Sequence, residues 1–326
     1  MRVMETTFLG ERAICAGNDE LAFTVVPAWG SNLISIVHKP TGRELLRTPA
    51  TAEQFRQSPV LYGTPVLFPP NRIADGSFTY RGREYRFHVN EPERRNHLHG
   101  FVYDRPWEVV RADIEAGRPV VETQFAAERA SDWHEIAGQF PHHFIITMRY
   151  ELDGNGLHKS ATVHNDGGEP LPLGIGFHTC FRFPKTARLA LTVAKRWVLD
   201  ERMLPTGAVE ETSLVAELRR GMNLAGVPLD DAFLADTDTA GDDGPNEAKL
   251  LLPEEGMEIL YRVDASFKHW VVYNRDGESG FICPEPYTWV TNAPNLPLPP
   301  ELTGFQELLP GESKTFSTSI AVSVTP

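Results

Sequence analysis

The chain has 326 residues, 41% of them hydrophobic and 23% charged, and it carries a formal net charge of −13. This composition is typical of a globular protein with a large apolar core. The negative charge and the lack of a long basic run argue against nucleic acid and anionic membranes as partners, because both are bound through clustered Lys and Arg. The sequence has neither an apolar run that could span a bilayer nor the apolar segment of a signal peptide, so we expect a cytoplasmic protein.

Three cysteines, Cys15, Cys180 and Cys283, are spread along the chain without a C-x-x-C spacing. An odd number of cysteines at such spacing favours reduced thiols over a framework of disulfides. Reduced thiols agree with a cytoplasmic location.

Short runs of alternating apolar and polar residues dominate the chain, and this alternation is typical of half-buried strands. Turn residues such as Asp153–Gly156 separate the runs, so residues 144–163 predict a strand, a tight turn and a strand. The predicted strands are Leu21–Val26, Asn32–His38, Trp107–Ile114, Val120–Phe125, Phe144–Leu152, Lys159–Val163, Ala187–Val193, His269–Asn274 and Thr315–Val324.

Helical periodicity is scarce. It predicts short helices at Thr51–Gln57, around Ser131–Gly138 and at Glu210–Leu218. The Gly- and Asp-rich stretch Ala240–Asn246 predicts an exposed loop. Because strands do not alternate with helices and no domain boundary is evident, we expect an all-β fold with residues 1–326 in a single domain, a large antiparallel β-sandwich.

Two histidines flank Leu98 in the motif Asn96–Gly100. In a strand, His97 and His99 would point to the same face, which is one way to begin a metal site. No third ligand stands at a recognisable spacing, so we favour a site without metal. The alternative is that one histidine faces a ligand while the other is a hydrogen-bonding spacer.

A histidine and a glutamate stand out because each lies in an apolar context. His178 occurs in GIGFHTCF, and Glu285 lies between two prolines after an apolar run. His178 could equally be a core histidine, and Glu285 could lie at the surface end of a strand. If the fold brings them together, they are a histidine and a carboxylate that can move protons on a polar substrate.

Further polar residues could bind that substrate. Arg72 follows Asn71 in a loop stiffened by two prolines, and its planar guanidinium can hydrogen-bond hydroxyls, although most loop arginines are simply solvated. Asp230 and Asp231 are less specific, since both could lie in a solvated turn. Tryptophans could stack on sugar faces or fill the core. These are Trp29, Trp107 and Trp289.

Seven motifs occur in order along the chain: PAWGSNLISI (27–36), TPVLFPPNRIADGSFTYRGREY (64–85), NHLHGF (96–101), GIGFHTCF (174–181), LDDAF (229–233), CPEPYTWVTNAPN (283–295) and LLPGES (308–313). Taken in this order, they resemble the aldose 1-epimerase family, the galactose mutarotases. The resemblance covers nearly the whole chain and implies a β-sandwich of the galactose-mutarotase type, with no metal or organic cofactor and with a small-molecule sugar substrate. Its implied reaction is the interconversion of the α and β anomers of a free aldose.

The resemblance also implies roles. Glu285 would be the general base and His178 the general acid, with His99 as a further site histidine. Among the substrate-binding candidates, Arg72 and Asp230 would hold sugar hydroxyls. Asn71 and His97 complete that set.

Two motifs depart from those of the galactose-acting members. Residues 179–182 read Thr-Cys-Phe-Arg instead of a Tyr-Phe-Asn-like run, and Gly100 is followed by Phe101 instead of a second glycine. Two other functions stay open, namely a non-catalytic carbohydrate-binding protein on the same fold and an epimerase of hexose phosphates. For the latter, Arg182 and Lys185 are the nearby basic residues. The preferred sugar and the oligomeric state are open as well.

Overall fold

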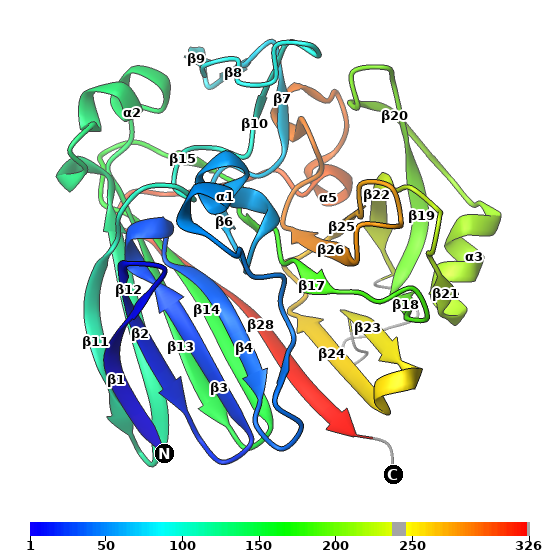
Figure 1. Cartoon of the computed structure of the whole chain (residues 1–326). Helices are drawn as coiled ribbons and strands as arrows, with labels where there is room; N and C mark the ends of the chain where they lie inside the picture. The colour runs from blue at the N-terminus through cyan, green and yellow to red at the C-terminus, as the bar shows by residue number, and fades with distance from the viewer. Residues whose placement is uncertain (237–245, 325–326) are drawn as a thin grey trace.

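The computed structural model describes residues 1–236 and 246–324 (Figure 1). Its largest unit is a nine-stranded antiparallel sheet with the order β11-β12-β13-β14-β28-β24-β23-β18-β21. The strands are β11 (Glu108–Glu115), β12 (Arg118–Ala126), β13 (Phe144–Asp153), β14 (Gly156–Asn165), β28 (Ser313–Val324), β24 (Met257–Val263), β23 (Asn246–Leu252), β18 (Arg188–Leu191) and β21 (Met222–Asn223).

A five-stranded antiparallel sheet packs on one end of this large sheet, so that β1 and β2 contact β11 and β12 (Figure 1). Its order follows the chain. The strands are β1 (Arg2–Phe8), β2 (Glu11–Gly17), β3 (Leu21–Val26), β4 (Asn32–His38) and β5 (Arg43–Glu44). Side chains along β13 alternate between buried and half-buried, as a strand between core and solvent requires.

A third sheet has the order β20-β19-β22-β25-β26-β16-β6, with β17 also paired to β26. Its strands are β20 (Pro205–Glu210), β19 (Val193–Leu199), β22 (Asp230–Ala235), β25 (His269–Tyr273), β26 (Phe281–Tyr287), β16 (Gly176–Phe177), β6 (Val66–Leu67) and β17 (Phe181–Arg182). Three two-stranded ribbons complete the described strands. They are β7 (Arg72–Ala74) with β10 (Asn96–Leu98), β8 (Ser77–Tyr80) with β9 (Arg83–Arg86), and β15 (Leu171–Leu173) with β27 (Gln306–Leu308).

Helices are short and peripheral. The α-helices are α1 (Ala52–Gln57), α2 (Trp133–Gln139), α3 (Ser213–Arg220) and α5 (Pro300–Thr303). Single 3-10 turns are η1 (Pro27–Trp29), η2 (Pro59–Leu61), η3 (Ala127–Arg129), η4 (Pro253–Glu255) and η5 (Ala293–Asn295). Among the described residues, no helix is long and apolar enough to cross a membrane.

The predicted all-β, antiparallel sandwich is confirmed. Leu21–Val26 and Asn32–His38 are strands with the predicted bounds, and most of the other predicted strands lie within a few residues of observed ones. Ala187–Val193 is the exception, because Thr192 divides it between β18 and β19. These two strands belong to different sheets, so the prediction of one strand there was wrong.

The predicted helices are present with shifted starts. Helix α1 begins after Thr51, whose hydroxyl accepts a hydrogen bond from Gln54 N and caps the helix. The third helix starts three residues later than predicted, because Glu210 still belongs to β20 and Thr212 is the cap. Residues 240–245 of the predicted loop lie outside the described residues, and Asn246 begins β23.

Candidate active site

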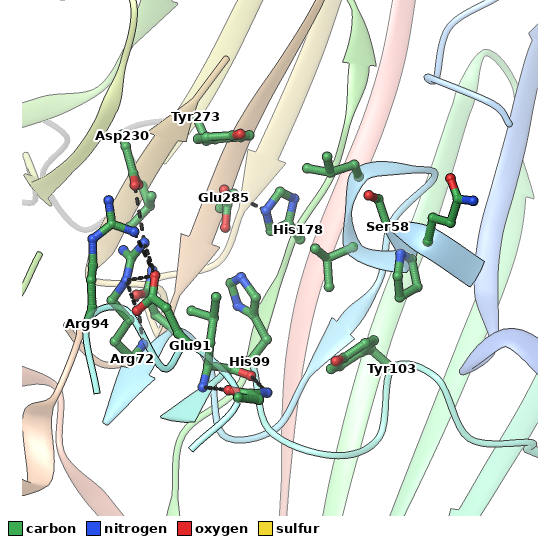
Figure 2. Close-up of a pocket in the computed structure, with 18 residues that line it drawn as sticks. Ser58, Arg72, Glu91, Arg94, His99, Tyr103, His178, Asp230, Tyr273 and Glu285 are labelled. Carbon is green, nitrogen blue, oxygen red and sulfur yellow. Dashed lines mark hydrogen bonds and ion pairs between the residues drawn. The ribbon is translucent and has the colours of Figure 1, made fainter. Parts of the chain in front are cut away.

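A cavity of about 500 Å³ lies where the third sheet meets the β7–β10 ribbon and α1 (Figures 1 and 2). Six residues predicted for the site line it, although they come from distant parts of the chain. They are Asn71, Arg72, His99, His178, Asp230 and Glu285. The fold therefore brings together all the predicted site residues except His97.

A buried histidine and a buried glutamate, His178 and Glu285, meet at the cavity wall (Figure 2). Glu285 is on β26, and His178 follows β16, which pairs with β26. Nε2 of His178 lies 3.2 Å from Oε1 of Glu285, and their exposed fractions are 4% and 1%. The hydroxyl of Tyr287 donates to Oε2 of the same carboxylate, and the Asn71 amide donates to that hydroxyl over 3.4 Å.

The glycines before His178 make room for this arrangement. A Cβ on Gly176 would lie 2.2 Å from the ring of Tyr287, so a side chain there would displace the residue that holds Glu285. The glycines of the pattern Gly-Ile-Gly at residues 174–176 thus make room for aromatic rings.

Burial and mutual contact shift the pKa of both groups upward. Burial raises the pKa of the Glu285 carboxyl above its usual range, and contact with His178 and Tyr287 only partly offsets this. For His178, burial lowers the pKa, but the charge of Glu285 and the sulfur of Cys180 outweigh burial and raise it above the usual histidine range. Both groups therefore keep their protons to higher pH than isolated side chains would.

Arg72 is held in place by a second buried carboxylate. Its Nε donates to Oε2 of Glu91 over 3.0 Å and its Nη2 donates to Oε1 over 3.1 Å, while Nη2 also reaches Oδ2 of Asp230 at 3.2 Å. Glu91 accepts further bonds from Arg94 and Asn96, each over 2.9 Å. Such a fork between two carboxylates fixes the guanidinium at the cavity wall.

The choice between the two neighbouring aspartates is settled by strand alternation. Asp230 faces the cavity, whereas Asp231 lies 2.7 Å from Nη2 of Arg196, a residue that does not line the cavity. Successive side chains of β22 point to opposite faces, as expected for a strand.

His99 lines the cavity beside His178, with ring centroids 5.3 Å apart and an edge-to-face orientation. Burial, together with the charges of His178 and Arg72, holds the pKa of His99 well below its usual range, so this histidine is neutral. Its Nδ1 is buried, and among the described residues it has no hydrogen-bond partner. A neutral imidazole at the cavity wall can bind a hydroxyl.

Gly100 permits the tight geometry of this turn. A Cβ there would lie 2.0 Å from the carbonyl oxygen of Phe68, and the residue has φ of +71°. The tight approach lets the backbone N–H of His99 donate to the carbonyl of Asn71 over 3.0 Å.

His97 does not line the cavity. Its Nδ1 lies 2.8 Å from the carbonyl oxygen of His88, and its Nε2 accepts the backbone N–H of Gly100 over 3.1 Å. Both ring nitrogens are thus bound to the backbone, so His97 supports the turn rather than contacting a substrate or pairing with His99 at a metal.

Of the two alternatives for the tryptophans, sugar stacking and core packing, the structure shows core packing. The tryptophans considered for sugar stacking are buried and do not line the cavity; Trp29, for example, stacks on Phe55 at 3.9 Å. Tyr103 and Tyr273 line it instead.

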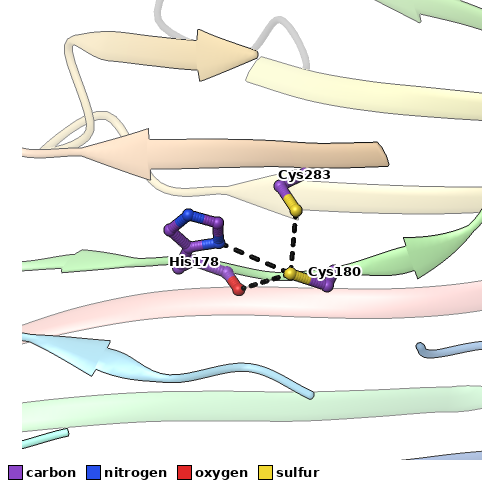
Figure 3. A group of neighbouring side chains, drawn as sticks. All are labelled: His178, Cys180 and Cys283. Carbon is purple, nitrogen blue, oxygen red and sulfur yellow. Dashed lines mark hydrogen bonds between the residues drawn. The ribbon is translucent and has the colours of Figure 1, made fainter. Parts of the chain in front are cut away.

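Other residues in and near the site bear on metal and phosphate binding. Nδ1 of His178 and the Sγ atoms of Cys180 and Cys283 lie within 4.8 Å of one another, and in the described part of the chain this is one group that could hold a metal ion (Figure 3). Arg182 and Lys185 do not line the cavity, and Lys185 is paired with Glu278.

The family model described as aldose 1-epimerase matches residues 12–321. The chain belongs to the aldose 1-epimerase family. Its solved relatives include a galactose mutarotase-like protein from Clostridium acetobutylicum, with 28% identity, a TM-score of 0.93 and 99% of each chain covered. Galactose 1-epimerase from Lactobacillus acidophilus NCFM shares the fold, with a TM-score of 0.77 at 16% identity. The match covers 100% of this chain and 99% of the Lactobacillus protein.

Among curated proteins, this aldose 1-epimerase family member is similar to the uncharacterized protein YphB of Escherichia coli strain K12. The two are 24% identical over 264 residues, which is 79% of this chain and 82% of YphB.

Three residues of this family member were not found by sequence reasoning. Glu91 and Tyr287 contact predicted site residues, and Tyr273 lines the cavity. Tyr287 lies two residues beyond Glu285 on one strand, so it faces the same side, and that spacing could have identified it. The sequence held no comparable signal for Glu91, since its contact with Arg72 depends on the intervening loop.

Proposed function

We propose that the protein is an aldose 1-epimerase that interconverts the α and β anomers of a free aldose, with Glu285 as general base and His178 as general acid. The observation that carries this proposal is the buried contact of 3.2 Å between the two side chains at the wall of a cavity. The cavity volume of about 500 Å³ suits a small ligand.

The reaction begins with the pair as an imidazolium and a carboxylate. Glu285 removes the proton of the C1 hydroxyl while His178 donates a proton to the ring oxygen, and the bond between C1 and the ring oxygen breaks. Both oxygens are attached to C1, so an acid and a base that lie a hydrogen bond apart can reach them together. The product is the open-chain aldehyde.

Rotation about the C1–C2 bond then presents the other face of the aldehyde. Glu285 returns its proton to the carbonyl oxygen, and His178 takes the proton of the C5 hydroxyl as the ring closes. The two groups end in their starting protonation states, so no cofactor or net redox change is needed.

The other lining residues bind and orient the sugar. Arg72 and Asp230 form a donor–acceptor pair for neighbouring hydroxyls. His99 is neutral and lies beside His178, where it can bind the oxygen that gains charge as the ring opens.

A neutral sugar fits the charges of the cavity better than a phosphorylated one. The arginines that line it, Arg72 and Arg94, are both paired with Glu91. Arg182 and Lys185 do not line the cavity. A phosphate would require uncompensated cationic donors.

Polarimetry on freshly dissolved α-D-glucose and α-D-galactose tests the proposal. We expect the purified protein to accelerate the approach to equilibrium for at least one of them, above the spontaneous rate. Tight sugar binding without acceleration would favour the carbohydrate-binding alternative. Acceleration confined to hexose phosphates would favour the phosphate epimerase.

A further inference from the structure

Two thiols, those of Cys180 and Cys283, meet beside His178 (Figure 3). Cys180 follows His178 by two residues, and Cys283 precedes Glu285 by two. Strand β17 pairs antiparallel with β26, and continuing that register places Cys180 opposite Cys283. Their Sγ atoms are 2.8 Å apart.

The backbone around the two thiols suits a disulfide. The N–H of Cys180 donates to the carbonyl of Gly63 over 2.9 Å, away from β26, so Cys180 and Cys283 form a non-hydrogen-bonded cross-strand pair. Cα atoms in such pairs are about 4.5 Å apart. Disulfides span Cα separations of roughly 4.4 to 6.8 Å, so the pair can be joined with little backbone movement.

The same geometry disfavours a metal ion. Thiolates bound to zinc at about 2.3 Å in a tetrahedral site lie well over 3 Å apart, so the observed pair would have to spread. In the described part of the chain, three donors converge at this point, whereas a closed structural zinc site uses four.

Both thiols are fully buried, and Cys180 contacts two residues that line the cavity. Its Sγ lies 3.4 Å from Nδ1 of His178 and 3.5 Å from the carbonyl oxygen of Val60, and both residues line the cavity. Burial raises the pKa of Cys180, but its contacts with Cys283 and His178 outweigh burial and lower it to about 6. The thiolate is the reactive form of cysteine.

We propose that Cys180 and Cys283 are a reversible oxidation site, at which hydrogen peroxide forms a disulfide that slows the acid–base pair. The Cys180 thiolate attacks one peroxide oxygen, the O–O bond breaks, and the leaving hydroxide takes up the proton lost by Cys180 to become water. Cys283 then attacks the resulting sulfenic acid, forming the S–S bond and releasing a second water. The two thiols lose two electrons to one peroxide, and a dithiol reductant such as dithiothreitol reverses the step.

The effect on rate rests on the proposed function. In the disulfide, the Cys180 sulfur is no longer a thiolate that stabilises the imidazolium of His178 through Nδ1. We expect the rate of mutarotation to fall about 3- to 10-fold, the size of one lost hydrogen bond.

The test exposes the full-length protein to hydrogen peroxide, alkylates the remaining thiols under denaturing conditions and maps the peptides by mass spectrometry. We expect a linked peptide that joins Cys180 to Cys283 and a slower rate by polarimetry. Dithiothreitol should remove the link and restore the rate. Cys15→Ser is the matched control and should behave as the wild type, because this half-buried thiol lies on β2. Cys283→Ser and Cys283→Ala should not form the link, with folding checked by circular dichroism.

Several results would overturn the proposal. The two cysteines could stay as free thiols, oxidise separately to sulfinic acids, or react only after a chelator removes a bound metal. A disulfide without a change in the rate of an active enzyme would refute its link to the acid–base pair. If the reduced wild type shows no mutarotation at all, the proposed function fails, while peptide mapping still decides whether the oxidation site exists.

Discussion

Two sides of the cavity are built around the same kind of contact, a buried carboxylate beside a nitrogen cation, yet the two contacts differ in what they can do. On the arginine side, Arg72 lies against Glu91. On the histidine side, His178 lies against Glu285. A guanidinium does not release its proton at neutral pH, whereas an imidazolium does. The arginine side can therefore hold a substrate, and only the histidine side can exchange protons with it.

The surroundings of each carboxylate reinforce this difference. Arg72, Arg94 and Asn96 all donate to Glu91, and although burial raises its pKa, these bonds outweigh burial and lower it, so it stays ionised. Glu285 has fewer donors and its pKa is raised. Deeper burial and fewer donors raise the pKa of Glu285, whereas three donors keep Glu91 a fixed charge.

The largest effect is expected from removing the base. Glu285→Gln keeps the shape of the side chain but cannot accept the C1 proton, so kcat should fall by about 10²- to 10⁴-fold with little change in Tm. Polarimetry and thermal melting measure the two quantities. Glu278→Gln, an exposed carboxylate outside the cavity, is the control and should keep the wild-type rate. A rate for Glu285→Gln within about threefold of wild type would remove the distinction between the two sides.

A smaller effect, on binding, is expected on the arginine side. Arg72→Lys keeps the charge opposite Glu91 but loses the planar fork, so KM should rise about 5- to 30-fold while kcat changes little. Lysine is preferable to alanine here, because alanine would leave Glu91 buried without its partner and destabilise the fold. Arg196→Lys alters the neighbouring pair with Asp231 outside the cavity and should leave KM unchanged. A fall in kcat with constant KM would show that Arg72 takes part in the chemistry.

The dependence of kcat/KM on pH should sharpen the comparison further. The active pair holds one proton, so activity rises as the pair loses its first proton and falls as it loses the second. Because the pKa of both groups is raised, both limbs should lie on the alkaline side of the values for isolated Glu and His. A bell centred near pH 5 would contradict the raised pKa values.

Loss of the hydrogen bond from Tyr287 to Glu285 should slow the reaction about 3- to 10-fold, the size of one hydrogen bond. The Tyr287 hydroxyl lowers the pKa of Glu285, so Tyr287→Phe should raise that pKa, reduce the rate at neutral pH and move the acid limb to higher pH. Tyr261→Phe is the control, because Tyr261 is buried and bonded to Thr179 but does not line the cavity. An acid limb that does not move would assign Tyr287 a purely structural role.

Chelation should have no effect on the rate, because Nδ1 and Nε2 of His97 are both bound to the backbone and cannot complete a metal site with His99. Activity measured after dialysis against a chelator checks this. Loss of activity that one divalent ion restores would refute the metal-free mechanism.

The sequence predicted the sandwich, and it selected two side chains that the fold brings together at the cavity, for different reasons. Alternation along strands such as β3 and β4 is a local property, so their bounds were found from the residues alone. His178 and Glu285 were ambiguous individually, and only the order of the motifs along the chain identified them. Their contact is a result of β16 pairing with β26, which no local pattern encodes.

What the sequence did not predict depends on the direction of side chains and on loops. Asp230 and Asp231 are equivalent by composition, and the face that each takes is set by the register of β22 on β25. His97 and His99 are similar in the same way. His97 lies in β10 with its ring bonded to the backbone, whereas His99 follows that strand with a φ of 70° and lines the cavity. Glu91 reaches Arg72 across a loop that carries no pattern of its own.

The central claim is that His178 and Glu285 act as one proton-transfer unit. The most direct measurement is polarimetry on the wild type, Glu285→Gln, His178→Asn and the double variant, with folding verified for each. Each single variant should lose about 10²- to 10⁴-fold in kcat, and the double variant should lose much less than the product of the two, because residues that act as a unit are not additive. Losses that multiply in the double variant would show two independent contributions and would contradict the account.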